Sequence, residues 1–456
     1  TSVKKLTTVS AYTFRLRRVD RSLISRIALS GDRETYPLAP RSKPDSNQGM
    51  ASHAPARATG ARLDSVATYR ALSSARARLA ARDAAILHAQ ITLAEIAAPT
   101  GEEHERGAFV ARRFRALGLR DIEVDEAANV IGRRPGRSGL PPIVVCAHLD
   151  TVFPRGTSLS VRRDGARLVG PGINDNSRGL AVMLAIAEEI DGSRLTSRRP
   201  IDFVATTGEE GLGDLRGAKR YFDGRGRDAA ATIALDGAGD ERVVTRALGS
   251  RRFRVSFVGT GGHSWAAFGS PNAVHAAAGA AARLAALRLP LEPRTTLSVG
   301  RIGGGISVNS IPDHAWLEID LRSTSGEMLD RYEREILLAS RAACEEENNR
   351  RAFGTRALSM AIQPIGTRPC GETSVEHPLV RHALAATRLV GREPDVATAS
   401  TDANIPIARG IPAIAIGAGG RGGDAHTQSE WFDNTDGSRG VSRALTIVFG
   451  AAEMED

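Results

Sequence analysis

Residues 143–150 read IVVCAHLD, and residues 201–210 read IDFVATTGEE. Both are short apolar runs that end in titratable side chains, as buried strands do when they lead into a site. The run ATIALD at 231–236 has the same form, and helical patterns lie at 177–190 and after Gly213. Strands that alternate with helices predict an α/β fold. We therefore expect the loops at the carboxyl ends of these strands to carry the functional site.

The chain before these strands has a helical pattern. Residues 66–98 are rich in Ala, Leu and Arg at helical spacing, and Pro99 stops the pattern. A capping signal then starts a second helix over 102–117. Two short strands are predicted at 122–124 and 129–133. These elements lead directly into the first buried strand, so we assign them to the same domain.

The pattern changes near Gly249. The run SRRFRVSFVGT, which begins at residue 250, alternates apolar and polar side chains, as a half-exposed antiparallel strand does. A helix, two more alternating strands and a long helix follow, with predicted ranges 271–288, 295–304, 314–323 and 326–350. This order of elements predicts a small α+β sandwich.

The α/β pattern returns from about residue 358, with a helix at 378–390 and the strand IPAIAIG at 411–417. The sandwich is therefore predicted to be an insertion. We divide the folded chain into an inserted domain over 249–357 and a discontinuous α/β domain made of residues 66–248 and 358–456.

The first 65 residues differ from the rest. They hold twelve Lys or Arg and five Asp or Glu, so most of the net charge of +9 lies there. Residues 37–60 are rich in Pro, Ser, Ala and Arg, which is typical of a linker. We predict a disordered basic tail over residues 1–65 and do not expect a nucleic-acid partner. The alternative is that the basic tail binds nucleic acid or an anionic surface. Met50 is a candidate translation start, in which case the residues before it are not native.

The composition is that of an ordinary globular protein, with 41% hydrophobic and 25% charged residues. No apolar run reaches about 18 residues, so we expect no membrane partner. The three cysteines, Cys146, Cys344 and Cys370, are far apart and odd in number. That argues against a disulfide framework and for a reducing compartment, so we expect a cytoplasmic protein.

Five groups that can hold a metal ion lie where strands or loops are predicted to end. They are His148, Asp175, the pair Glu209-Glu210, Asp236 and His426. One zinc needs three or four ligands, whereas two zincs that share a carboxylate need about five protein groups and a water. The set fits the second case and leaves one acid over to act as a base. This combination predicts metal-assisted hydrolysis of an amide.

The local sequence suggests how these groups divide the work. Asp150 lies two residues after His148 on the same strand face, where it can hold the far ring nitrogen. Asp175 precedes a helix in a Gly-rich loop and can reach two metals. One acid of the pair Glu209-Glu210 can bind metal while the other takes a proton from water.

Each signal is weak alone. The ordinary interpretations are a histidine in a turn, a helix cap at Asp175 and a solvated acidic pair. His426 is otherwise a histidine of a surface loop, and His263, in VGTGGHSW, is otherwise a turn residue. His263 lies in the inserted domain, so it reaches a metal site only across a domain or subunit boundary, where it can donate to an oxyanion. The metal interpretation depends on the whole set, in order and at strand ends.

From about residue 75 to the C-terminus the chain resembles the M20 family of co-catalytic zinc peptidases and deacylases. The motifs that carry the resemblance are HLDT, GxxDN, GEEG, LDGAG, GGHS, NSIPD and the late loop GGDAHT. The resemblance implies a zinc-exopeptidase-like α/β/α catalytic domain. It also implies that residues 249–357 form a dimerisation or lid domain and that the protein is a homodimer.

The resemblance implies a ligand set for two Zn²⁺ ions. His148 and Asp236 would bind one or other zinc, Asp175 would bridge both, and Glu210 and His426 would complete the pair. Co²⁺ or Mn²⁺ fits the same ligands.

It also implies roles around the metals. Glu209 would be the general base and then the acid to the leaving amine, and Asp150 would orient His148. The peptide bond Asp175-Asn176 would be cis.

The resemblance extends into the inserted domain. His263 would be the oxyanion donor, which the partner subunit supplies in many members. Asn309 and Arg322 match positions that often hold the substrate's carboxylate or carbonyl. The histidine lies in HSW here, where the family has HSH or HPG, and this departure bears on the shape of the substrate pocket.

Asp236 favours one branch of the family. An Asp at this position resembles aminopeptidases and dipeptidases, whereas Glu resembles carboxypeptidases and deacylases of the acetylornithine or succinyl-diaminopimelate type. The DGAG context is similar to tripeptide aminopeptidases of the peptidase T type, while HLDTVFP also resembles glutamate carboxypeptidases. We expect a two-zinc aminopeptidase that acts on short peptides. The close alternative is an N-acyl-amino-acid deacylase or carboxypeptidase, and the alternative of another class is a non-catalytic binding protein on the same fold.

Overall fold

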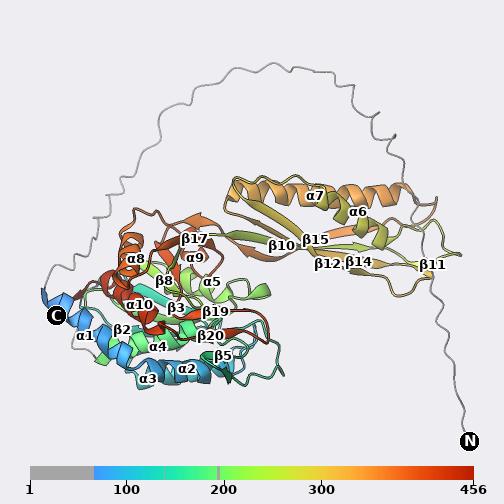
Figure 1. Cartoon of the computed structure of the whole chain (residues 1–456). Coiled ribbons are helices and arrows are strands. Elements are labelled where there is room, and N and C mark those ends of the chain that lie inside the picture. The colour runs from blue at the N-terminus through green and yellow to red at the C-terminus, as the bar shows by residue number, and fades with distance from the viewer. Residues whose placement is uncertain (1–65, 138, 193–195, 456) are drawn as a thin grey trace, which may run out of the picture. The chain divides into compact units, whose positions relative to one another are not determined.

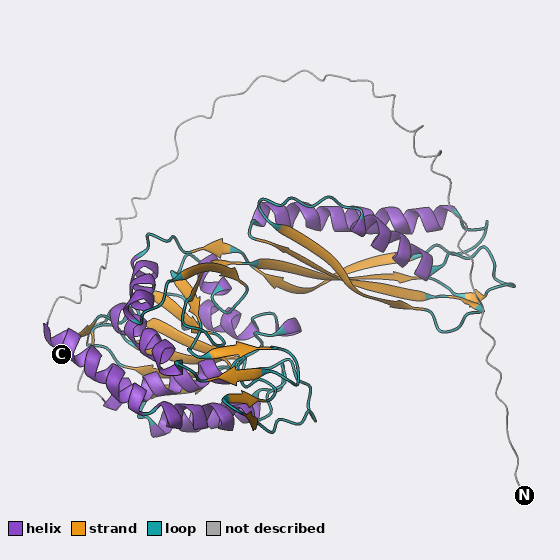
Figure 2. Cartoon of the chain, in the orientation of Figure 1, coloured by secondary structure: helices purple, strands orange, loops and turns teal. Residues whose placement is uncertain are grey.

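A computed structural model of the chain describes residues 66–137, 139–192 and 196–455. The predictions of a basic tail over residues 1–65 and of a start at Met50 lie outside the described residues. Within the described part, one large sheet and one four-stranded sheet carry most of the strands, and helices pack on both (Figures 1 and 2).

The large sheet has the order β1-β2-β7-β3-β8-β18-β9-β16, and β17 also pairs with β9. Its strands are β1 (Arg120–Val124), β2 (Val130–Arg134), β3 (Ile143–His148), β7 (Ile201–Thr206), β8 (Ala231–Leu235), β9 (Arg242–Ala247), β16 (Gly371–Glu372), β17 (Asp395–Ala399) and β18 (Ala413–Ile416). The central strands β7, β3, β8 and β18 run parallel. Every residue of these four strands is buried, because helices cover both faces.

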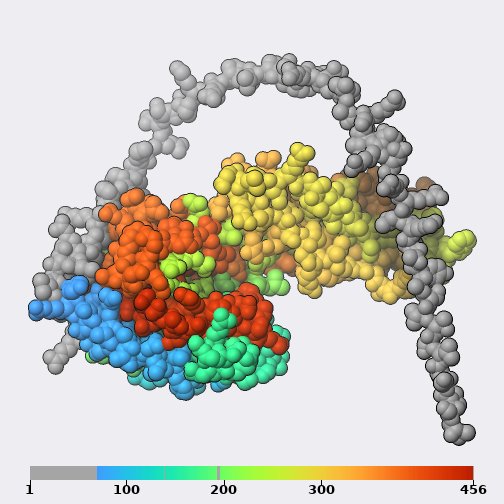
Figure 3. Space-filling model, viewed as in Figure 1, coloured from blue at the N-terminus to red at the C-terminus, as the bar shows by residue number. Residues whose placement is uncertain are grey.

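Two hydrophobic clusters lie on opposite faces of this sheet. One cluster takes in α4 (Ser177–Gly192), α8 (Pro378–Leu389) and α10 (Gly437–Ala451), together with α1 (Val66–Ala81), α2 (Asp83–Ala94) and α3 (His104–Ala116). The other takes in α5 (Arg216–Asp223) and α9 (Asn404–Ala408). The helix α1 packs against α10 although they come from opposite ends of the described chain (Figure 3). The result is the predicted three-layer α/β/α arrangement.

The second sheet is antiparallel, with the order β12-β14-β10-β15. Its strands are β10 (Gly249–Val258), β12 (Thr295–Gly304), β14 (His314–Ser323) and β15 (Ser359–Arg368). The helices α6 (Ala273–Ala285) and α7 (Gly326–Asn349) share one hydrophobic cluster with it. The predicted order of a strand, a helix, two strands and a helix is therefore present.

The sequence pattern did not predict the strand β15. Because β15 belongs to this sheet, the sheet extends beyond the predicted domain boundary at residue 357. β15 contains Pro364 and Gly366, both unfavourable in strands. It is an edge strand, and its pairing with β10 shifts register between Arg252 and Phe253. An edge position tolerates a proline that a central strand would exclude.

Smaller pairings position the loops. β4 (Arg162–Asp164), β5 (Arg167–Val169), β19 (Arg421–Gly423) and β20 (Trp431–Asp433) form a sheet in which β20 pairs with β5. This pairing brings the late GGDAHT loop next to the chain that leads into Asp175. Two short pairs complete the strands, β6 (Thr196–Ser197) with β21 (Met454–Glu455) and β11 (Gly262–His263) with β13 (Ser310–Ile311). A 3₁₀ turn, η2 (Gly211–Gly213), follows Glu210.

Several of these elements went unassigned at the level of sequence: β9, β17, α10, the four short strands of the β20 sheet and the break between α1 and α2 at Arg82. α10 contains Gly440 and Gly450 and several β-branched residues, all of which lower intrinsic helix propensity. None of the described helices is long and apolar enough to cross a membrane.

Candidate active site

Three neighbouring strands of the large sheet end at the same edge. β3 lies between β7 and β8 and ends at His148. Glu209 and Glu210 follow the end of β7, and Asp236 directly follows the end of β8. Because these strands are parallel, their carboxyl ends bring the four side chains to one place.

The first group of possible ligands consists of His148, Asp175 and Asp236. One nitrogen or oxygen atom from each lies within 4.8 Å of the other two. The Nε2 atom of His148 lies 3.0 Å from Oδ1 of Asp175 and 3.9 Å from Oδ1 of Asp236. His148 is buried, so these oxygens are its neighbours on that side of the ring.

The second group consists of Asp175, Glu210 and His426, again with one atom from each within 4.8 Å. The Nε2 atom of His426 lies 2.9 Å from Oε1 of Glu210 and 3.4 Å from Oδ2 of Asp175. Asp175 therefore contacts one histidine through each of its two carboxylate oxygens. His426 has a φ of +67°, which is uncommon for a residue other than glycine and occurs often in functional loops.

The electrostatics of the two groups fit bound cations. Burial raises the pKa of Asp236, and the nearby charge of Asp175 adds to this effect. Burial and Asp175 likewise raise the pKa of Glu210. The hydrogen bond to Asp175 raises the pKa of His426 to about 9. Acids crowded into a buried space repel one another, and a divalent cation relieves that repulsion. Two imidazoles and three carboxylates, with one carboxylate shared, form a suitable donor set for two such ions.

Glu430, which sequence analysis did not single out, fixes the loop that carries Asp175. Its carboxylate accepts hydrogen bonds from the backbone N–H groups of Gly172, Asn174 and Asp175 at 3.2, 2.8 and 2.8 Å. Burial raises the pKa of Glu430 to about 7, although these N–H groups oppose the shift. Asp175-Asn176 is a cis peptide bond, as the resemblance implied. The only sequence signal for Glu430 is an acid close after His426.

The carboxylate of Asp150 makes its short contacts with the turn after β7. It accepts hydrogen bonds from the backbone N–H groups of Glu209 and Glu210 at 3.0 and 2.9 Å, and from the Thr100 hydroxyl at 2.9 Å. Its Oδ1 atom lies 3.6 Å from Nδ1 of His148, while the backbone oxygen of Asp150 is nearer, at 3.1 Å. Asp150 therefore places the acidic pair, and its backbone oxygen is the closer partner of the ring.

Arg368 is a second residue that sequence analysis missed. Its Nη1 atom donates to Oε1 of Glu209 at 3.0 Å, and both side chains are buried. Burial raises the pKa of Glu209 well above its usual range, while the charge of Arg368 acts in the opposite direction. The sequence TRPC marks no motif, so one arginine among 61 basic residues gave no signal.

The histidine and the asparagine predicted from the inserted domain lie next to each other. His263 is in β11, and the backbone N–H of Ser264 donates to the backbone oxygen of Asn309 at 2.9 Å. The Nδ1 atom of His263 accepts from the backbone N–H groups of Trp265 and Ala266 at 3.2 and 3.4 Å. The side chain of His263 is exposed and belongs to none of the groups of possible metal ligands among the described residues.

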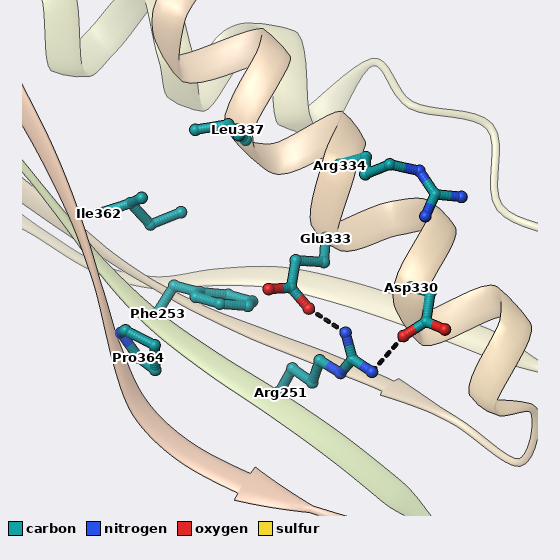
Figure 4. A pocket seen from close by; sticks show the side chains of 8 residues that line it. All are labelled: Arg251, Phe253, Asp330, Glu333, Arg334, Leu337, Ile362 and Pro364. Atoms are coloured by element: carbon teal, nitrogen blue, oxygen red, sulfur yellow. Dashed lines mark hydrogen bonds and ion pairs between the residues drawn. The ribbon is translucent and has the colours of Figure 1, made fainter.

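Arg322 lies on β14, where it donates to Asp320 at 2.6 Å. On the same sheet, a pocket opens between α7 and the strands β10 and β15 (Figure 4). Its lining consists of Arg251, Phe253, Asp330, Glu333, Arg334, Leu337, Ile362 and Pro364. Arg251 joins the carboxylates of Asp330 and Glu333 at its edge. No predicted site residue lines this pocket, so it is separate from the ligand groups.

Comparisons with known proteins agree with this geometry. The chain is 25% identical over 398 residues to the uncharacterized protein YqjE of Bacillus subtilis (strain 168), a match that covers 81% of this chain and 98% of that protein. It is 26% identical over 237 residues to a succinyl-diaminopimelate desuccinylase of Corynebacterium glutamicum, a match that covers 50% of this chain and 64% of that protein. The fold matches a crystal structure of a tripeptidase from Staphylococcus aureus with a TM-score of 0.66 and 23% sequence identity. This match covers 81% of this chain and 98% of the tripeptidase chain.

A sequence model of Peptidase family M20/M25/M40 matches residues 144–448, which is more than half of the chain. The matched range begins within β3 and ends within α10, so it includes β7, β8 and all the ligand groups described above. The chain therefore belongs to peptidase family M20/M25/M40 and is a hydrolase of that family.

Proposed function

We propose that this hydrolase is a two-zinc aminopeptidase that releases N-terminal residues from short peptides. The observation that carries the proposal is the pair of ligand groups that share Asp175. One metal would be held by His148, Asp175 and Asp236, and the other by Asp175, Glu210 and His426. Cobalt or manganese would suit the same donors.

The reaction needs a base beside the metals. Bound zinc supplies Lewis-acid activation of the scissile carbonyl and of the attacking water. Glu209 is absent from these two groups but forms a third with His148 and Glu210, in which one atom from each residue again lies within 4.8 Å of the other two. This position supports a role for its carboxylate in accepting the proton of the attacking water and passing it to the departing amine.

His263 is suited to stabilise the oxyanion. Because its Nδ1 atom accepts backbone hydrogen bonds, the neutral ring carries its proton on Nε2, which is then a donor. A donor aimed at the developing negative charge lowers the barrier to hydrolysis. We place His263 in the active site of the partner subunit of a homodimer, where Asn309 and Arg322 contact the substrate's carboxylate or carbonyl.

Three observations bear on the substrate. Asp236, and the similarity in fold to a protein described as a tripeptidase, support the aminopeptidase. The similarity in sequence to a succinyl-diaminopimelate desuccinylase supports a second candidate, an N-acyl-amino-acid deacylase, and a carboxypeptidase is a third form of the same chemistry. The aminopeptidase differs from the other two candidates because it requires a free amine on the residue before the scissile bond.

The deciding experiment counts metals and measures turnover on one preparation. We expect about two zinc ions per chain and release of the N-terminal alanine from Ala-Ala-Ala, with that alanine isotopically labelled, in a reaction that a chelator abolishes. Release of the unlabelled C-terminal alanine would instead indicate a carboxypeptidase. Hydrolysis of N-acetyl-Ala-Ala alone would replace the aminopeptidase with the deacylase or carboxypeptidase. Absence of turnover on both peptides from metal-loaded protein would refute the proposed function.

A further inference from the structure

The carboxylate of Glu209 has one hydrogen-bond partner in the described part of the chain, and that partner is Arg368. The Nη1 atom of Arg368 donates to Oε1 of Glu209 at 3.0 Å, and Nη2 donates to the backbone oxygen of the same residue. The two side chains are only 6% and 8% exposed. The planar guanidinium thus grips Glu209 at two points, the carboxylate and the backbone.

Arg368 itself is held in place by the loop 399–404. The Oγ atom of Ser400 accepts from Nη1 of Arg368 at 3.2 Å. The Nδ2 atom of Asn404 donates to the backbone oxygens of Pro369 and Leu248 at 2.8 and 2.9 Å. These two backbone oxygens belong to the two links between the sheets, β15 to β16 and β9 to β10. Ser400 therefore contacts the guanidinium directly, and Asn404 holds the backbone of the residue that follows Arg368.

A purely structural salt bridge is the alternative explanation. Two buried charges cost much of their mutual attraction in lost hydration, so a buried pair gives little net stability. The pair also lies beside the proposed metal site, because one oxygen of Glu209 is within 4.8 Å of ligand atoms of His148 and Glu210. This location favours a role in the reaction over a purely structural one.

We propose that Arg368 is a positioning residue for the hydrolysis proposed above, on which this inference rests. It holds the Glu209 carboxylate at the edge of the ligand groups in the orientation in which it accepts and returns the proton. A proton transfer depends steeply on the distance and angle between donor and acceptor, so a base that rotates away slows the reaction without weakening substrate binding.

The two hydrogen bonds to Glu209 depend on the shape of the guanidinium as well as on its positive charge. Lysine keeps the charge but lacks the planar fork, so it does not reproduce the geometry in which one nitrogen holds the carboxylate of Glu209 and a second nitrogen holds its backbone oxygen. Arg368→Lys therefore disturbs this two-point contact, and Arg368→Met removes it together with the charge. Arg254 supplies a matched control on the same sheet, because it pairs with Glu318 and stacks on Trp316 away from the site.

The first test measures kcat and KM of the metal-loaded full chain on whichever peptide the wild type hydrolyses. For both Arg368 variants we expect kcat to fall by about 10- to 100-fold, with KM within about twofold and the metal content unchanged. Arg254→Met should match the wild type. A kcat within twofold of the wild type for both Arg368 variants would overturn the positioning role, as would a loss of metal or a rise in KM that accounts for the whole defect.

A second test is independent of activity. The thermal unfolding midpoints of Glu209→Gln, Arg368→Met and the double variant are compared with the wild type in metal-free protein. Because the two side chains contact each other, the double variant should lose less than the sum of the single losses. Additive losses would contradict the contact. Failure of the wild type to hydrolyse either peptide refutes the proposed function, whereas active Arg368 variants beside an active wild type refute only the role of Arg368.

Discussion

At the scale of single residues, the structure separates two adjacent acids that the sequence presents as a pair. Glu210 lies 2.9 Å from His426 and belongs to a ligand group that includes Asp175. Glu209 instead contacts Arg368 at 3.0 Å. Successive residues at a strand exit point in different directions, so neighbours in sequence reach different partners. The assignment of base and ligand stays a prediction, and this geometry supports it.

Replacing Glu209 with Gln tests the base. Gln keeps the shape of the side chain but cannot accept a proton, so we expect kcat to fall by about 10² to 10⁴-fold or more. The metal content should stay at the wild-type value, because the five proposed metal ligands are intact. Metal analysis and steady-state kinetics measure both effects. The control is Glu126→Gln, because Glu126 is an exposed carboxylate that pairs with Arg220. Near-normal turnover in Glu209→Gln would rule out Glu209 as the base.

At the scale of elements, long-range contacts set the loop that carries Asp175. The carboxylate of Glu430 is hydrogen-bonded to backbone N–H groups across more than 250 positions of the chain. The pairing of β20 with β5 brings Glu430 to that loop, since β20 begins at the next residue, Trp431. The shape of the metal-ligand groups therefore depends on a small sheet outside the main one.

The variant Glu430→Gln should weaken metal binding. The amide removes the negative charge and one acceptor from a site that receives three N–H groups, so the Asp175 loop loses part of its support. Loss of a residue that hydrogen-bonds to a metal ligand typically costs about 10- to 100-fold in metal affinity. Competition with a chromogenic chelator measures this affinity. Asp433→Asn, on the same strand, is the control, and an affinity equal to the wild type in Glu430→Gln would contradict the role.

The packing of α8 on α10 should depend on pH. The Nε2 atom of His382 on α8 lies 2.9 Å from the backbone oxygen of Thr446 on α10, and burial lowers the pKa of His382. The unfolded chain then binds a proton more readily than the folded one, so the free energy of unfolding falls as the pH drops below the unfolded pKa of about 6.5. In His382→Gln, which keeps a donor, this loss should be smaller. Urea unfolding at pH 7.5 and 5.5 measures the free energy of unfolding of the wild type and of His382→Gln. An equal loss of stability in both proteins would argue against a role of His382.

At the scale of the whole molecule, the proposed site is complete only when the inserted domain contributes. His263 is exposed in β11 and lies outside every group of possible metal ligands among the described residues. Its Nδ1 atom is occupied by backbone donors, which leaves Nε2–H for a partner. A homodimer that exchanges this histidine would join two parts that are far apart in the sequence.

Mixing two inactive variants tests that exchange. His263→Ala should lower kcat by about 10²-fold, as loss of one oxyanion donor does. If each site combines Glu209 of one chain with His263 of the other, co-refolding Glu209→Gln with His263→Ala gives half mixed dimers with one intact site each. Activity should return to about a quarter of the wild type. His314→Ala, exposed in the same domain, is the control, and failure to regain activity in confirmed mixed dimers would place His263 in its own subunit's site or outside the reaction.

The sequence by itself determined the α/β order, the α+β insertion and the five ligand candidates, because buried strands have continuous apolar runs and parallel strand ends meet at one edge. The residues it could not reveal are those that act through distant contacts. Arg368 reaches Glu209 across 159 positions, and Glu430 reaches the Asp175 loop across 255. No local pattern marks such pairs, since neither residue type nor spacing predicts which arginine or glutamate will be buried beside a given partner. Only the packing of β15 and β20 decided them, because these strands bring their ends to the edge where the ligands gather.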